Sequence, residues 1–316
     1  MYVRPTDQPT SLYCPFPSTI NHFAQKLKTY TLDWVRDLKL VSDSKQQQKF
    51  LQADFTLLSA RCYPTANWEQ LKLLTVWNIW LFFLDDLVDE QQLGRQPDTL
   101  VVFIQQLIEI LRGTTTPNPH NPIETSLSYF YNEASQQFPN PVWHKRFLDS
   151  FDKSLAAALW EANNRQKCLI PTIEDYIDNR VDTSGITSIL ELINIVGLVE
   201  LPPAILDSPD ILKISLTVNN IICWANDIVS YRKEHHCGDF HNLVLVIQHE
   251  RLCLVEEACL DAIEIHNQSI HKLLILEQQL LQYPSGREVK IKNYITVLNP
   301  WICGNFDWQS GSGRYL

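Results

Sequence analysis

Apolar residues recur every three to four positions along most of this chain. In the segment 67–90 they occupy positions 73, 74, 77, 80, 81, 84 and 88, which is the period of an α-helix. Similar patterns extend over three further segments, residues 98–113, 147–167 and 211–234. Thr172 is a plausible N-cap residue for another helix that begins after it. These patterns predict a chain built mainly of helices.

The segment 242–282 contains neither Gly nor Pro, so it forms either one very long helix or two shorter ones. Strand signals are nearly absent, because the β-branched run at 243–247 lies within a helical period. Several helical segments are apolar on almost every side, as in helices that lie in an interior or line a cavity. We therefore expect an all-α helical bundle of roughly ten or more helices around an apolar pocket.

The chain of 316 residues is predicted to form one domain over residues 1–316. No Ser-, Gly- or Pro-rich spacer divides it, and the longest turn-rich stretch, residues 113–122, is only the size of a loop. A hydrophobic fraction of 45% is enough to fill a substantial core.

The composition also limits the partners of the protein. A net charge of −10 without a block of Lys or Arg argues against nucleic acid, so an anionic substrate would need local cations or metal ions. No stretch reaches the ~18 uncharged apolar residues of a membrane span, and the start lacks the pattern of a signal peptide. We expect no stable membrane insertion and a cytoplasmic location. The eight cysteines form no CxxC pair and are expected to be buried thiols in a reducing compartment.

A cluster of acids, "FFLDDLVDE" at residues 82–90, follows the most aromatic segment. Asp85 and Asp89 are four positions apart and share one helix face, and Phe82 lies a turn earlier on the same stripe. A solvated helix end is the common explanation for such clusters. Here the acids continue an apolar wall and lie near a helix C-terminus, where the macrodipole disfavours negative charge. A bound cation would stabilise them, and oxygen ligands on one face suit Mg²⁺.

A second set of oxygen ligands lies in "NDIVSYRKE", residues 226–234. Asn226, Ser230 and Glu234 follow one another at intervals of one helical turn and drift only about 80° around the helix. An amide oxygen, a hydroxyl and a carboxylate form a hard-oxygen set for another Mg²⁺, with Lys233 beside them as a phosphate contact. Taken alone, buried polar residues and a surface acid explain this stretch about as well.

With both motifs present, the sequence resembles a class I terpene synthase, or terpene cyclase, of the bacterial single-domain kind. "DDLVD" resembles the aspartate-rich motif of that family, and "NDIVSYRKE" matches its Asn/Ser/Glu metal motif. Arg180 stands where the family has a diphosphate-sensing arginine. "LYCPFPS" and "WICGNFDWQSGSGRYL" resemble its N- and C-terminal segments, so the resemblance extends over residues 12–315.

The resemblance implies three Mg²⁺ ions that bind a prenyl diphosphate at the mouth of an apolar pocket. Asp85 would be the principal ligand of the first motif, with Asp89 weaker or one step removed. The ligands implied for another ion are Asn226, Ser230 and Glu234. The residues implied to contact the diphosphate are Arg180, Lys233, Arg314 and Tyr315.

Family members also use the loop after the arginine to trigger ionisation. Here Thr183 would be the linker, and Ser184 would present its backbone carbonyl. Two aromatic residues are expected in the pocket: Phe82 because of its helical stripe, and Trp308 because of the resemblance. Trp77 and Trp80 lie on the opposite side of their helix and are expected in the core.

The substrate implied by the resemblance is farnesyl diphosphate, the commonest choice of the family, which would be converted to a cyclic sesquiterpene. Cyclisation of a C20 or C10 diphosphate is the alternative. Relatives are often dimers, so a homodimer is possible by the same resemblance.

Three other hypotheses are weaker. A chain-elongating prenyltransferase would need a second aspartate-rich motif in place of Asn226, Ser230 and Glu234. A non-catalytic module that holds a prenyl ligand would have no need of two complete metal motifs. The stretch "HHCGDFH" at 235–241 could bind zinc, but no second ligand pair with zinc spacing accompanies it, and Gly238 makes it a turn.

Overall fold

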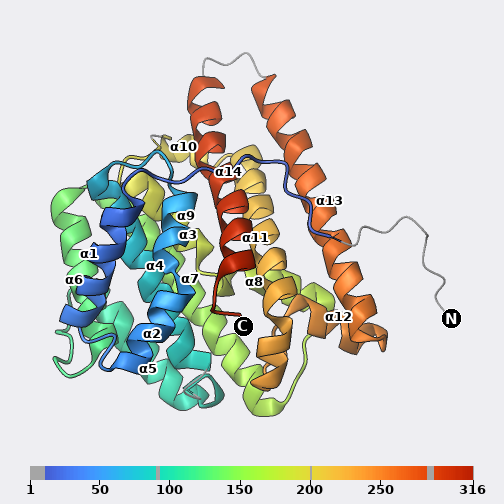
Figure 1. The fold of residues 1–316 in the computed structure, drawn as a ribbon, viewed down its shortest axis with the longest axis horizontal. Coiled ribbons are helices and arrows are strands. Elements are labelled where there is room, and N and C mark those ends of the chain that lie inside the picture. The colour runs from blue at the N-terminus through green and yellow to red at the C-terminus, as the bar shows by residue number, and fades with distance from the viewer. Residues whose placement is uncertain (1–10, 90–92, 200, 283–287, 316) are drawn as a thin grey trace.

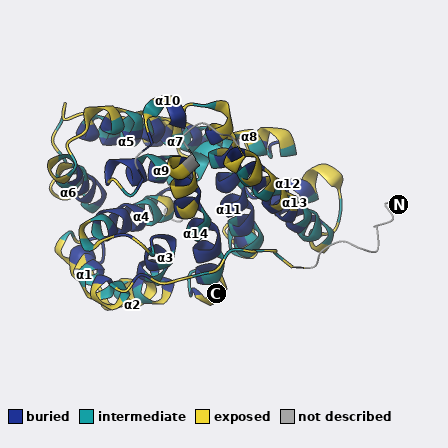
Figure 2. Cartoon of the chain, turned by 90° about the horizontal axis from the view of Figure 1, so that it is seen from above, coloured by how far each residue is buried: buried dark blue, intermediate teal, exposed yellow. Residues whose placement is uncertain are grey.

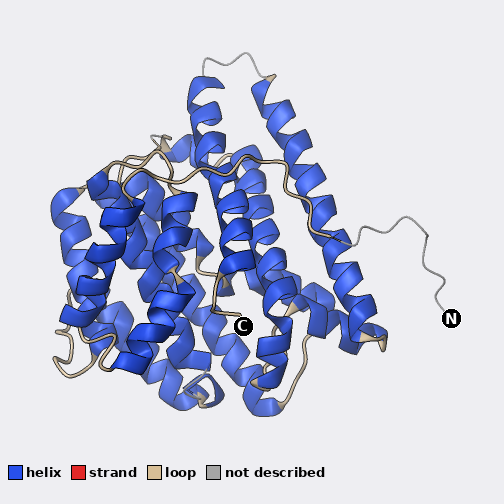
Figure 3. Ribbon diagram, in the orientation of Figure 1, coloured by secondary structure: helices blue, strands red, loops and turns tan. Residues whose placement is uncertain are grey.

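The computed structural model describes residues 11–89, 93–199, 201–282 and 288–315 (Figure 1). Over these residues the chain forms helices and no strands, so the prediction of an all-α fold is confirmed (Figure 3). The first helices are α1 (Ala24–Asp37), α2 (Ser44–Ala53), α3 (Phe55–Cys62), α4 (Trp68–Asp89), the short 3₁₀ helix η1 (Leu93–Arg95), α5 (Pro97–Leu111), α6 (Pro122–Gln137) and α7 (Pro141–Lys167). The remaining helices are α8 (Ile173–Thr183), α9 (Ile186–Ile195), α10 (Pro203–Leu206), α11 (Pro209–His236), α12 (Leu243–Arg251), α13 (Val255–Leu281) and α14 (Glu288–Gly311).

Helix α4 follows its predicted range of 67–90 closely. It begins where the side chain of Asn67 accepts a hydrogen bond from the Gln70 amide at 3.0 Å, and the Gln70 side chain accepts one from the Asn67 amide. Trp77 and Trp80 are fully buried and stack with ring centroids 5.1 Å apart. The indole of Trp77 also donates to Ser188 Oγ of α9 at 3.1 Å. The apolar side of α4 opposite Phe82 is therefore fixed in the core, as expected.

Helix α11 lies at the centre of the second half of the bundle. It packs against α8, α12, α13 and α14, and Figure 2 shows it among these neighbours from above. The middle of the helix, from Thr217 to Asp227, is mostly buried. The buried apolar side chains of both halves form one continuous cluster. This arrangement holds α4 and α11, which contain the two predicted metal-binding motifs, on opposite sides of a common space.

The segment 242–282 forms two helices rather than one, which decides between the two predictions made for it. Helix α12 ends at Arg251, and its C-cap residue Leu252 has a φ of 51°, which lies in the left-handed region. The amide of Leu252 still bonds to the Gln248 carbonyl, and α13 begins at Val255. A non-glycine residue makes this break, so neither Gly nor Pro signals it in the sequence.

The expectation of buried cysteines is only partly correct. All eight cysteines are free thiols, and Cys62, Cys223 and Cys303 are buried, but Cys168 and Cys237 are exposed. Both exposed thiols occupy C-cap positions, of α7 and α11, where the chain turns out of a helix and reaches solvent. Among the described residues, no helix is long and apolar enough to cross a membrane.

Candidate active site

A cavity of about 280 Å³ lies between α4, α7, α8, α11 and α14. Much of its wall is apolar. The apolar residues include Leu58, Leu81, Phe82, Leu84, Leu100, Phe103, Ile104, Leu107, Phe151, Leu155, Ile186, Ile189, Ile222, Trp301 and Trp308. Its polar and charged lining residues come mainly from α4, α7, α8, α11 and the C-terminus. The pocket thus combines an apolar interior with a polar region.

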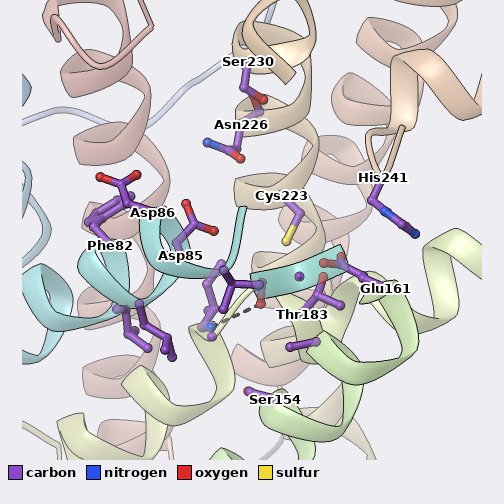
Figure 4. A pocket seen from close by; sticks show the side chains of 18 of the residues that line it. Phe82, Asp85, Asp86, Ser154, Glu161, Thr183, Cys223, Asn226, Ser230 and His241 are labelled. Atoms are coloured by element: carbon purple, nitrogen blue, oxygen red, sulfur yellow. Dashed lines mark hydrogen bonds between the residues drawn. The ribbon is translucent and has the colours of Figure 1, made fainter. Parts of the chain in front are cut away.

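The acids of α4 lie in that polar region. The guanidinium of Arg314 contacts Asp85 Oδ2 at 2.7 Å and Asp86 Oδ1 at 2.9 Å. Desolvation by the surrounding protein raises the pKa of the Asp85 carboxyl, and the positive charge of Arg314 opposes this effect. Figure 4 shows the carboxylate of Asp85 pointing into the same space as Asn226 of α11. The side chain of Asp89, the second ligand predicted on α4, lies outside the described part of the structure.

The three predicted ligands of α11, Asn226, Ser230 and Glu234, all line the cavity. Ser230 is buried, and its hydroxyl donates to the Asn226 carbonyl at 2.8 Å. Burial raises the pKa of Glu234 to about 8, with a further upward contribution from the charge of Asp227. Burial therefore disfavours the charged form of this carboxyl. A bound cation would stabilise that form, because it supplies the missing countercharge.

Arg180 extends from α8 toward α11. Its Nη2 donates to Asp227 Oδ1 at 2.9 Å and to Asn226 Oδ1 at 3.2 Å, and its Nη1 donates to Thr183 Oγ1 at 3.4 Å. Burial alone would lower the pKa of this arginine, but the surrounding acidic groups, with Asp227 the largest contributor among them, together raise it well above its usual value. The predicted sensor arginine is therefore a charged group held against one of the predicted metal ligands.

The predicted trigger loop is the junction between α8 and α9. Thr183 is the last residue of α8, Ser184 follows it, and Gly185 has a φ of 70°. Ser184 Oγ donates to Asn219 Oδ1 at 3.0 Å, which fastens the junction to α11. Thr183 and Ser184 both line the cavity.

The C-terminal residues close the same space. Trp308 is buried, and its indole donates to the Ala53 carbonyl at 2.7 Å. Tyr315 Oη accepts a hydrogen bond from Asn226 Nδ2 at 2.9 Å. The guanidinium of Arg314 lies 4.7 Å from the ring centroid of Phe82. The structure thus brings every described residue of the predicted site, Lys233 included, to the lining of one pocket.

Sequence reasoning missed three residues that hold this site together. Asp227 accepts from Arg180, from the Tyr176 hydroxyl at 2.7 Å and from the amide of Leu243 at 3.0 Å. Asn242 donates to Glu234 Oε2 at 2.8 Å and to the Asp227 carbonyl at 2.8 Å. Asp227 stands directly after Asn226, which is a visible signal, but nothing in the sequence connects Tyr176 or Asn242 to the motif.

A second charged cluster lines the cavity between α7 and the turn after α11. Arg165 Nη2 contacts Asp239 Oδ2 at 2.6 Å and Glu161 Oε2 at 3.3 Å, and His241 Nδ1 lies 3.0 Å from Asp239 Oδ1. His241 and Asp239 belong to the stretch considered for zinc, and here they pair with each other and with Arg165. Among the described residues, no three His, Cys, Asp or Glu side chains are grouped to hold a metal.

The donor set nevertheless fits hard cations. Asp85 from one side and Asn226, Ser230 and Glu234 from the other supply carboxylate, amide and hydroxyl oxygens to one space, which is the ligand chemistry of Mg²⁺. Cationic side chains at the same end suit an anion that accompanies the metal.

Known proteins resemble this chain over nearly its whole length. The sequence model of the family described as terpene synthase family 2, C-terminal metal binding, matches residues 76–272. Germacrene A synthase of Nostoc punctiforme is 31% identical over 304 residues, which cover 96% of this chain and 94% of that protein. (+)-T-muurolol synthase of Roseiflexus castenholzii is 32% identical over 310 residues, which cover 98% of this chain and 94% of that protein.

Solved structures show the same fold. Germacradien-4-ol synthase from Streptomyces citricolor has a TM-score of 0.82 at 23% identity, over 95% of this chain and 98% of that one. The structure of a-eudesmol synthase has a TM-score of 0.83 at 21% identity, over 96% of this chain and 100% of that one.

Proposed function

Because this chain belongs to terpene synthase family 2, we propose that it is a carbon–oxygen lyase that ionises a prenyl diphosphate and cyclises the hydrocarbon that remains. The observation that supports this most directly is the pocket itself. Its apolar wall ends where Asp85 of α4 faces Asn226 of α11 (Figure 4). A prenyl diphosphate has the same two parts, an apolar chain and an anionic end.

The diphosphate end is proposed to bind with three Mg²⁺ ions. Asp85 and Asp89 would hold ions on the α4 side, and Asn226, Ser230 and Glu234 would hold another on α11. When bound, the ions neutralise the diphosphate and the charge that develops on it as the C–O bond breaks. Net charge −10 of the chain is therefore compatible with an anionic substrate.

Four side chains of the protein are proposed to bind and orient the diphosphate: Arg180, Lys233, Arg314 and Tyr315. Arg180 acts together with the junction that follows α8, where Thr183 is the linker and Ser184 presents its carbonyl to the departing group. The hydrogen bond between Arg180 and Thr183 supports this assignment. Arg314 would exchange its contacts with Asp85 and Asp86 for contacts with the diphosphate.

The hydrocarbon end is proposed to lie against Phe82 and Trp308. Their ring centroids are 5.6 Å apart, and Phe82 stacks on Phe55 at 4.3 Å. An apolar enclosure keeps bulk water from the carbocation, and aromatic faces stabilise positive charge. The substrate we propose is farnesyl diphosphate, since (+)-T-muurolol synthase of Roseiflexus castenholzii is named as cyclising that compound. A C20 or C10 diphosphate would use the same residues.

Two rival functions are less well supported. A chain-elongating prenyltransferase needs acids where α11 has Asn226 and Ser230. A module that only holds a prenyl ligand has no use for metal ligands on two facing helices. The single-domain organisation, the possible homodimer and the cytoplasmic location stay predictions from the sequence.

The function is tested by incubating purified protein with C10, C15 and C20 prenyl diphosphates, with and without Mg²⁺, and analysing extracts by GC–MS. We expect a cyclic C15 product that requires Mg²⁺. Elongated diphosphates formed after addition of isopentenyl diphosphate would indicate the prenyltransferase instead. No Mg²⁺-dependent product from any substrate would refute the proposal.

The metal site on α11 is tested by Asn226→Ala and Glu234→Ala. Each variant loses a cation ligand, so we expect turnover to fall by at least about a hundredfold. Circular dichroism should show that both retain the wild-type helical content. Asn220→Ala, on the same helix, is the matched control and should remain active. Full activity in both Asn226→Ala and Glu234→Ala would rule out this site.

A further inference from the structure

Three polar side chains meet beside the pocket, at α4, α14 and the end of α3. Tyr63 follows the last residue of α3, Asn78 lies in α4 and Trp301 lies in α14. Their exposed fractions are only 1%, 2% and 5%. Asn78 and Trp301 line the cavity. The ring of Tyr63 contacts that of Trp301 edge-on, with centroids 5.3 Å apart.

The polar atoms of this group lack hydrogen bonds of normal geometry. Tyr63 Oη, Asn78 Oδ1 and Trp301 Nε1 are buried, and none has such a bond to another described residue. The amide nitrogen of Asn78 donates to Ser59 Oγ at 3.1 Å, so either orientation of the amide leaves one polar atom for this space. Burial raises the pKa of Tyr63, while weak hydrogen-bonding contacts with Asn78 and Trp301, which fall short of normal hydrogen-bond geometry, oppose the shift. All three polar groups therefore lie close together and are only partly satisfied by one another.

These three groups are complementary to one water molecule. A buried water needs two to four polar partners. Asn78 Oδ1 accepts, Trp301 Nε1 donates, and the Tyr63 hydroxyl does either. Buried polar groups without protein partners are commonly satisfied by water. The lining residues Leu58, Leu81 and Phe82, which come from α3 and α4, are apolar and offer water no partner.

The group lies along the cavity rather than at its metal-binding end. Asn78 precedes Asp85 on α4 by about two helical turns, or roughly 10 Å. Phe82 stands between them on the same helix and lines the same pocket. A substrate whose diphosphate binds near Asp85 would therefore extend its hydrocarbon chain toward Asn78.

We propose that Tyr63, Asn78 and Trp301 bind one water molecule as a reactant, so that the product is a cyclic sesquiterpene alcohol. This inference rests on the proposed function. A lone pair of the water forms a C–O bond to the carbocation produced by loss of diphosphate and ring closure. The resulting oxonium gives one proton to an oxygen of the released diphosphate. The products are the alcohol and singly protonated diphosphate, and no oxidant or reductant is needed.

A water molecule bound at this site can attack fewer carbon atoms of the substrate than bulk water could. Because three helices fix its position, it attacks only the cationic carbon that the folded substrate brings next to Asn78. The apolar wall still excludes other water. The site therefore selects the position of the hydroxyl group as well as its presence.

The first test uses the wild-type protein with farnesyl diphosphate and Mg²⁺ in ordinary water and in water enriched in oxygen-18. GC–MS should show an alcohol as the main product, with one heavy oxygen incorporated in the enriched medium. A hydrocarbon as the main product would overturn the inference and leave the proposed function intact. So would an unlabelled alcohol, because its oxygen would then come from the substrate.

The second test removes the polar groups while keeping their volume. Asn78→Leu and Tyr63→Phe should each reduce the alcohol share of the product severalfold, and hydrocarbons formed by proton loss should replace it. The midpoint of thermal unfolding of Tyr63→Phe should stay close to wild type, so a change in its product would not reflect loss of the fold. If Asn78→Leu fails to fold, Tyr63→Phe still decides the question.

Ser154→Ala is the matched control, because Ser154 also lines the cavity but its hydroxyl already donates to the Ser150 carbonyl at 3.2 Å. It should leave the alcohol share unchanged. An unchanged alcohol share in Tyr63→Phe and Asn78→Leu, or an equal loss in Ser154→Ala, would refute the assignment of the water to this site. Absence of any Mg²⁺-dependent product would overturn the proposed function and this inference together.

Discussion

Asn242 has two roles at once. Its Oδ1 accepts from the Val244 amide at 2.9 Å as the N-cap of α12, and its Nδ2 donates to Glu234 at 2.8 Å. The side chain is fully buried, so both bonds are shielded from solvent. A residue that orients a metal ligand in this way typically affects metal affinity by ~10–100-fold.

We predict that Asn242→Ser raises the Mg²⁺ concentration needed for half-maximal turnover by roughly tenfold. Serine can still cap the helix, but it is too short to reach Glu234. The measurement is turnover against Mg²⁺ concentration, together with thermal stabilisation by Mg²⁺ and inorganic diphosphate.

The control is Asn140→Ser, the same exchange at the N-cap of α7, where Asn140 accepts from the Val142 and Trp143 amides. It should change stability and leave the Mg²⁺ requirement unaltered. A wild-type Mg²⁺ requirement in Asn242→Ser would show that its bond to Glu234 is unimportant.

At the scale of elements, the junction of α8 and α9 depends on one glycine. Gly185 has a φ of 70°, and a Cβ there would lie 3.3 Å from Leu81 Cδ1 of α4. Gly197, after α9, has a φ of 69° with no atom within 4 Å of a Cβ. A substitution at Gly197 therefore tests backbone strain alone, whereas one at Gly185 adds a contact with the pocket residue Leu81.

Both Gly185→Ala and Gly197→Ala are predicted to lose about 1–2 kcal/mol of unfolding free energy, because an L-residue is strained in the left-handed region. Only Gly185→Ala should also reduce turnover, since Leu81 lines the pocket and Thr183 and Ser184 precede the turn. Urea unfolding and steady-state kinetics measure the two effects. Equal kinetics in both variants would contradict a role for this junction in the site.

The helices themselves were largely predictable. Residues 67–90 and 211–234 were expected to be helical, and α4 and α11 begin and end within about two residues of those limits. A period of 3.6 residues is a local property, so it can be read from the sequence. The break at Leu252 could not be predicted, because the packing of α12 and α13 imposes the left-handed conformation on a residue that does not favour it.

At the scale of the whole molecule, the turn from α11 to α12 is fastened to α7 by a buried ion pair. The side chains of Arg165 and Asp239 are 4% and 13% exposed. Burial alone would raise the pKa of Asp239, but the hydrogen bond from His241 and the charge of Arg165 hold it well below its usual range. The same turn contains Asn242, so this pair supports the position of Glu234.

This pair predicts a loss of stability in acid. A carboxyl with a depressed pKa in the folded protein stabilises it above the unfolded pKa of about 3.9, and this contribution is lost as the pH falls below that value. The free energy of unfolding should therefore decrease from about pH 5 to about pH 3, and the decrease should be smaller in Asp239→Asn. Urea titrations at several pH values measure it.

Asp149→Asn serves as the control, because Asp149 pairs with Lys145 on the surface, where both side chains are more than half exposed. Exposed pairs contribute little, so this variant should keep the pH dependence of the wild type. The interpretation fails if Asp239→Asn and the wild type lose stability equally over the same range.

The sequence by itself determined the helical fold class and the positions of the oxygen ligands, because ligands one turn apart on a helix need no information beyond the local period. Only the tertiary structure decided what surrounds them. Arg314 meets Asp85 across 229 positions of sequence, and Tyr63, Asn78 and Trp301 meet from three helices. Such contacts follow from how the helices pack. Packing depends on the fit of many side chains at once, so no local pattern specifies it.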